Sequence, residues 1–144
     1  ELASELRYND PLIDEHTLLI VLSQSGETAD TIAAMKECKK RGAKTLAVVN
    51  VVGSTIANTA DYTLYTWAGP EIAVASTKAY TTQLAVMFML VAKMAQLRGA
   101  MTEEEVKSYI AELQKVPERM KDILDRRSEI HVIAKEVLEK ILEI

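Results

Sequence analysis

The fold of this chain is constrained most by an apolar run that ends in a short polar loop and continues into an amphipathic helix. Residues 17–22 form a run of strand length with the composition of a strand buried on both faces, as in a parallel sheet. The loop 23–28 reads Ser-Gln-Ser-Gly-Glu-Thr, and apolar residues spaced for one helical face follow it. A strand passing into a helix in this way indicates an α/β fold.

The same loop has the chemistry of a phosphate site. Unpaired N–H groups and a partial positive charge at a helix start favour an anion. Ser23, Ser25 and Thr28 add hydroxyls, and Gly26 lets a ligand approach the backbone. No Lys or Arg lies within the loop, so it is not a nucleotide P-loop. The alternative is that Ser25 only caps the helix, by accepting a hydrogen bond from an N–H near Thr28.

Strand and helix patterns alternate through the first hundred residues. We expect strands at 17–22, 44–49 and 61–66, a helix over 28–41 that ends at Gly42, and a long helix over 77–98. A short helical turn is expected at 54–59. This order predicts a three-layer αβα sandwich with a parallel, doubly wound, flavodoxin-like sheet.

The last part of the chain differs in character. Apolar residues recur at helical spacing beyond residue 101, and Pro117 forces a break or a new first turn. We therefore expect two amphipathic helices, or one kinked helix, that serve packing or oligomerisation. The predicted organisation is a domain over 1–100 and a helical tail over 101–144.

Composition excludes several classes of function. The 17 basic and 21 acidic residues of this 144-residue chain give a net charge of −4 and form no basic stripe, which argues against nucleic acid binding. Cys38 is the single cysteine, so we expect no internal disulfide and a reducing, cytoplasmic setting. The apolar run 84–92 is too short to span a bilayer, and the first residues do not resemble a signal peptide. His16 and His131 have no evident partner carboxylate, so we expect both to be structural or solvated.

A second loop, 69–78, enters the long helix as the first loop enters the shorter one. In a doubly wound sheet both loops open at the carboxyl ends of the strands, where ligands bind. Two helix starts could then face one ligand. The alternative is that Ser76 and Thr77 act only as N-cap residues.

Three blocks together resemble the sugar isomerase (SIS) family, and within it the isomerase region of the glutamine–fructose-6-phosphate aminotransferases. The blocks are 23–31, 50–54 and 71–84. The Ser-Gln-Ser-Gly-Glu-Thr hexapeptide is typical of phosphosugar-binding SIS domains, and the block 71–84 narrows the resemblance to the aminotransferases. The resemblance covers about residues 3–99.

This resemblance implies a binding site for fructose 6-phosphate or glucosamine 6-phosphate. Four residues would surround the phosphate, and the backbone of Val74 together with Ser76 would contact the sugar; the four are Ser23, Gln24, Ser25 and Thr28. Such enzymes add ammonia, released from glutamine by a separate glutaminase domain, to the ketose and isomerise the product, without a metal or organic cofactor. A cytoplasmic homo-oligomer, such as a dimer, in amino sugar biosynthesis is implied.

The chain also departs from the family pattern. It begins after the family's first strands and ends before the second SIS half, which supplies the catalytic Glu, the imine-forming Lys and the ring-opening His. Lys78 matches a position outside the imine role. We therefore expect a truncated fold with no catalytic residue and no activity by itself. The run 17–22 would be an unpaired edge, and it and the apolar tail would drive self-association.

Two other functions are compatible with parts of the pattern. A non-catalytic SIS domain that senses a phosphosugar in a regulatory protein would use the same first loop. A nucleotide or flavin binder of similar architecture is weakened by the absence of a Gly-x-Gly-x-x-Gly turn. The block 71–84 favours the aminotransferase.

Overall fold

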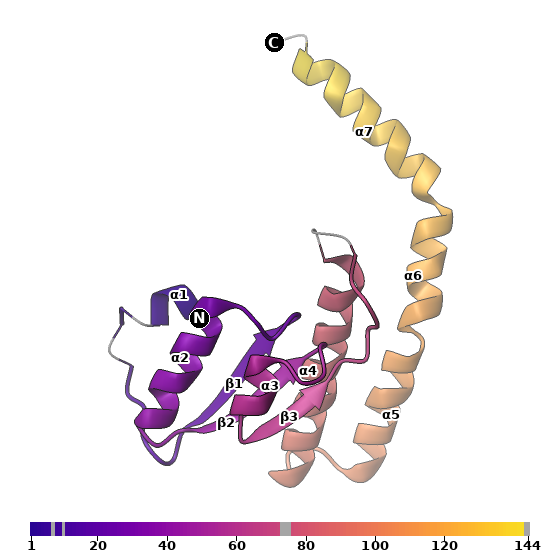
Figure 1. The fold of residues 1–144 in the computed structure, drawn as a ribbon. Coiled ribbons are helices and arrows are strands. Elements are labelled where there is room, and N and C mark those ends of the chain that lie inside the picture. Colours follow the sequence, from indigo (N-terminus) through magenta and orange to yellow (C-terminus); the bar gives the residue numbers. More distant parts are fainter. Residues whose placement is uncertain (7, 10, 73–75, 143–144) are drawn as a thin grey trace. The chain divides into compact units, whose positions relative to one another are not determined.

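The computed structural model describes residues 1–6, 8–9, 11–72 and 76–142 (Figure 1). The chain divides into two compact units. The units are Glu1–Leu90 and Val91–Ile144, and each is described by itself. The first contains α1 (Ala3–Leu6), β1 (Leu18–Ser23), α2 (Ala29–Lys40), β2 (Lys44–Val49), α3 (Thr55–Thr59), β3 (Tyr62–Tyr65) and the first part of α4 (Thr77–Leu97). The predicted domain boundary near residue 100 stays a prediction.

The predicted parallel sheet is confirmed. Its strands lie in the order β1-β2-β3, with Val21 opposite Ala47 and Ala47 opposite Thr63. Because all three strands are parallel, the loops that follow them emerge at one edge of the sheet. Within the described residues β1 pairs only with β2, so its other side is an open edge.

The core lies between the sheet and the two helices α2 and α3, which contact each other and the sheet. Met35 from α2 and Ile56 from α3 are fully buried against β2. Burying an apolar side chain of this size contributes about 1.5–3 kcal/mol. The opposite face of the sheet is more open, since Leu18, Leu22 and Leu64 are 47%, 46% and 39% exposed.

The predicted helix-ending glycine is confirmed at the turn between α2 and β2. Gly42 has a φ of 98°, a conformation that glycine adopts readily and that other residues avoid. Its N–H donates to the Lys39 carbonyl at 3.0 Å, which closes the last turn of α2.

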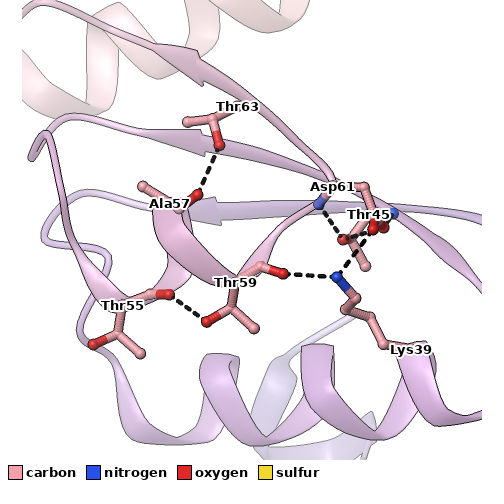
Figure 2. Close-up of polar contacts among 7 residues, drawn as sticks. All are labelled: Lys39, Thr45, Thr55, Ala57, Thr59, Asp61 and Thr63. Carbon is pink, nitrogen blue, oxygen red and sulfur yellow. Dashed lines mark hydrogen bonds and ion pairs between the residues drawn. The ribbon is translucent and has the colours of Figure 1, made fainter.

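A polar network secures the amino end of the sheet (Figure 2). The Asp61 carboxylate accepts hydrogen bonds from Lys39 Nζ at 3.0 Å and from the backbone N and the hydroxyl of Thr45, each at 2.8 Å. Lys39 Nζ also donates to the Thr59 carbonyl at 2.7 Å. The bond from Lys39, followed by those from Thr45, lowers the pKa of Asp61 from 3.8 to about 2. The network ties α2 to the starts of β2 and β3.

The N-terminal segment leaves the outer edge of β1 open. Helix α1 packs on α2, and the two helices and β1 surround an open cavity of about 370 Å³. Its apolar lining includes Leu2, Leu6, Leu19 and Met35. The described residues 1–6 therefore lie near β1 without pairing with it.

The second unit contains the end of α4 and three further helices: α5 (Glu103–Gln114), α6 (Val116–Asp125) and α7 (Arg127–Leu142). The expected break at Pro117 is confirmed, since this proline lies in the first turn of α6. A second break follows at Arg126, so the described tail holds three helices where the sequence predicted two, or one with a kink. Their apolar stripe is exposed, including Met120, Ile123, Leu138 and Ile141. No helix in the described ranges is both long and apolar enough to cross a membrane.

Candidate functional site

Three loops meet the carboxyl edge of the sheet. We call residues 23–28, from the last residue of β1 to α2, the first loop; residues 50–55, from β2 to the first residue of α3, the second loop; and residues 66–76, between β3 and α4, the third loop. Residues 73–75 of the third loop lie outside the described residues, and the predicted site residue Val74 is among them.

The first loop gathers the hydroxyls that the sequence singled out. The buried Ser23 hydroxyl accepts a hydrogen bond from Gly26 N at 3.0 Å and lies 3.2 Å from the Thr28 hydroxyl. Gln24 and Ser25 are half-buried and Thr28 is exposed. The four predicted phosphate-binding residues therefore belong to one continuous turn at the start of α2.

Capping of the helix does not explain these hydroxyls. The N-cap of α2 is Thr28, and its side chain makes no capping hydrogen bond. The Ser25 hydroxyl accepts from Glu27 N at 3.2 Å, before the helix begins at Ala29. Within the described residues Ser25 is therefore not the N-cap of α2, although its hydroxyl does accept a hydrogen bond from an N–H beside Thr28.

The second loop supports the first through a close backbone approach. Gly26 has a φ of 68°, and a Cβ at this position would lie 2.1 Å from the Ser54 hydroxyl. The Gly26 carbonyl accepts from Ile56 N at 3.0 Å. Ser54 is 3% exposed, and its hydroxyl has no hydrogen-bond partner in the part of the chain that the structure describes. Any side chain at this position would require Ser54 or the first loop to shift.

Glu27 is held by the second loop. Its carboxylate accepts from Thr55 N, at the start of α3, at 2.7 Å. This backbone hydrogen bond is the main cause of the lowered pKa of Glu27. The carboxylate therefore stays ionised and is bound to a backbone group, which is a structural role.

The third loop leads to Ser76, the other described residue of the predicted sugar contact. Ser76 is half-buried and has a φ of 52°, which is not the extended conformation of an N-cap residue. The Glu71 carboxylate instead accepts a hydrogen bond from Ala79 N, in the first turn of α4, at 3.2 Å. Ser76 thus lies directly before the start of α4, at the end of the third loop.

The sequence did not reveal Asn50 as a structural link between the loops. Its N–H donates to the Gln24 carbonyl of the first loop at 3.1 Å, while its side chain bonds to the third loop. A polar residue directly after a buried strand was the only available signal. Among the described residues no cluster of His, Cys, Asp and Glu could hold a metal, and both His16 and His131 are exposed.

Comparison with known proteins identifies relatives of this chain. Residues 1–93 match the SIS domain family. The chain is 51% identical over 136 residues to the glutamine–fructose-6-phosphate aminotransferase (isomerizing) of Caldanaerobacter subterraneus subsp. tengcongensis, covering 94% of the chain and 22% of that protein. It is 53% identical over 134 residues to the enzyme of the same name from Clostridium acetobutylicum, covering 93% and 22%. The chain thus spans about a fifth of the length of these relatives.

Solved structures show the same fold. The C-terminal domain of glucosamine-fructose-6-phosphate aminotransferase from Francisella tularensis superimposes with a TM-score of 0.76 at 38% identity, covering 81% of this chain and 33% of that one. A putative phosphosugar isomerase from Clostridium difficile 630 gives a TM-score of 0.66 at 29% identity, covering 72% and 30%. The predicted αβα fold with a parallel sheet is confirmed, and the chain belongs to the SIS domain family.

Proposed function

We propose that the three loops bind a phosphosugar, fructose 6-phosphate or glucosamine 6-phosphate, as part of the isomerase region of a glutamine–fructose-6-phosphate aminotransferase. The observation that carries the proposal is the first loop, where hydroxyls that do not cap the helix surround the start of α2. A phosphate there would gain hydrogen bonds and a favourable helix dipole. The names of the relatives at 51% and 53% identity support this ligand class.

The proposed contacts follow the sequence prediction. Ser23, Gln24, Ser25 and Thr28 hold the phosphate, while the Val74 backbone and Ser76 contact the sugar. In this proposal the partner that supplies ammonia is a glutaminase domain of the same enzyme. The intact protein is a cytoplasmic homo-oligomer, such as a dimer, and needs no metal or organic cofactor.

We assign no catalytic residue to this chain. Isomerisation needs an acid–base group placed beside the first two carbons of the sugar. The two carboxylates within the three loops already accept hydrogen bonds, Glu27 from Thr55 N and Glu71 from Ala79 N. The chain therefore provides binding, and proton transfer falls to groups of the intact enzyme outside it.

Calorimetric titration of the full-length protein tests the proposal. Fructose 6-phosphate should bind and fructose should not. Thr28→Val removes one hydroxyl but keeps the side-chain shape, and should weaken binding about tenfold, since a hydrogen bond to a charged group is worth roughly 1.5–3 kcal/mol. Thr63→Val is the matched control, because the Thr63 hydroxyl bonds to the Ala57 carbonyl and lies outside the three loops. Equal affinity for fructose 6-phosphate and fructose would refute the proposal.

A further inference from the structure

Asn50 is the one residue of the second loop whose side chain bonds directly to the third loop in the described structure. Its Oδ1 accepts from the Thr66 hydroxyl at 3.1 Å and from Ala68 N at 2.9 Å. Its Nδ2 donates to the Gly69 carbonyl at 2.7 Å. Three side-chain hydrogen bonds thus reach three separate residues, all 16 to 19 positions further along the chain.

These bonds enclose a strained residue. Trp67 lies between Thr66 and Ala68 and has a φ of 52°, in the left-handed region that a bulky side chain rarely adopts. Such a conformation persists only where its surroundings over-determine it. The Trp67 side chain is 76% exposed and contacts the Tyr65 ring at a centroid distance of 5.6 Å. Little burial therefore holds Trp67, and the Asn50 bonds on both sides of it supply the constraint.

Asn50 also reaches the first loop, by a different group. Its backbone N–H donates to the Gln24 carbonyl at 3.1 Å. Because this donor belongs to the backbone, it survives a side-chain substitution. A variant at Asn50 can therefore release the third loop while the first loop keeps its support.

We infer that Asn50 is a positioning residue that sets the described start of the third loop, residues 66–72, relative to the first loop, so that one phosphosugar can contact both. This inference rests on the proposed function. It separates two parts of the binding affinity: the first loop determines affinity for phosphate, and Asn50 determines the additional affinity that the sugar contributes.

Two measurements on the full-length protein test the inference. The first is hydrogen exchange of the segment 66–72 without ligand, where Asn50→Ala should speed exchange about tenfold or more, since three hydrogen bonds are lost. The second is the dissociation constant of inorganic phosphate divided by that of fructose 6-phosphate, a ratio that falls when the sugar contributes less to binding. Asn50→Ala should lower this ratio about tenfold, while the constant for inorganic phosphate changes less than about twofold.

Two further variants distinguish positioning from general stability. Asp61→Asn is the matched control, because the Asp61 carboxylate also accepts three hydrogen bonds, but at the opposite end of the sheet. It should leave the ratio and the exchange of 66–72 unchanged. Thr66→Val removes one bond to Asn50 and should lower the ratio less than Asn50→Ala does, and adding it to Asn50→Ala should have little further effect.

The outcomes separate this inference from the proposed function. If the unmodified protein binds fructose 6-phosphate no better than fructose, the proposed function fails, and the inference fails with it. If binding is as proposed but Asn50→Ala leaves the ratio unchanged, or lowers it no more than Asp61→Asn does, the inference alone is overturned. Unchanged exchange of 66–72 in Asn50→Ala overturns it as well.

Discussion

Replacing Gly26 by alanine should destabilise the chain through two separable effects. The first is conformational, because Gly26 has a φ of 68° and a left-handed backbone costs an L-residue about 1–2 kcal/mol. The second is steric, because the new Cβ would lie 2.1 Å from the Ser54 hydroxyl and 2.6 Å from its Cβ. Overpacking of this kind costs about 1–3 kcal/mol. Together they predict a loss of about 2–5 kcal/mol in the free energy of unfolding.

A double-mutant cycle can separate the two effects. Ser54→Gly removes both atoms that the new Cβ would meet, and glycine is tolerated at an N-cap position at a cost of a few tenths of a kcal/mol. Ser54 is the N-cap of α3, and its side chain makes no capping bond there. In the Ser54→Gly background, Gly26→Ala should therefore cost only the conformational part, about 1–2 kcal/mol.

Urea titration followed by circular dichroism provides the assay, with the free energy of unfolding obtained by linear extrapolation at two protein concentrations. The same variants should be titrated with fructose 6-phosphate, because the first loop must shift to admit the Cβ. Gly26→Ala should bind more weakly, and Ser54→Gly should recover part of the loss. Equal destabilisation by Gly26→Ala in the two backgrounds would show that the contact with Ser54 is not tight.

Three other predictions follow from the structure. The pKa of Asp61 is held at about 2, below its ordinary value of 3.8, so the stability that its ionised form contributes is complete above about pH 4 and is lost as the pH falls toward 2. Asp61→Asn should remove this part of the acid-unfolding curve. An unchanged curve would count against the network. The 144-residue chain should not convert fructose 6-phosphate and ammonia to product. Turnover that Glu71→Gln abolishes would show instead that this chain contains a catalytic group. The open edge of β1 and the exposed apolar stripe of α6 and α7 should cause self-association, which light scattering across a concentration series checks; a monomeric mass at tens of micromolar would contradict it.

The strands and the long helices could be predicted because each has a strong local signal. The apolar runs place β1 and β3 within a residue or two and β2 at the observed bounds, Lys44–Val49. Gly42 and Pro117 mark a helix end and a helix start by their own backbone restrictions. The second break in the tail, at Arg126, has no such residue, and the apolar spacing continues across it. A periodic pattern therefore could not reveal it.

The sequence could group the residues of the first loop, but it could not predict the contacts that support them. The hydroxyls of this loop are adjacent in sequence, so a helix start and a glycine were sufficient to group them. The supporting contacts join positions far apart along the chain: Glu27 bonds to Thr55, and Asn50 bonds to Thr66. These pairings depend on how neighbouring strands place their loops, which follows from the sheet order and not from local spacing.

The two ends of the sheet are stabilised by different chemistry, and this bears on how an anion could bind. The amino end uses an ion pair, Lys39 with Asp61, whereas the first loop has no Lys or Arg and contains a carboxylate, Glu27. A phosphate near Glu27 would be repelled by its charge, which the hydrogen bond from Thr55 N orients but does not neutralise. This hydrogen bond is 2.7 Å long and comes from the side of the second loop. Attraction for phosphate must then come from backbone N–H groups and hydroxyls, whose effect depends on loop geometry more than on net charge. This explains why Gly26, Ser54 and Asn50, which carry no charge, should matter as much to binding as the hydroxyls themselves.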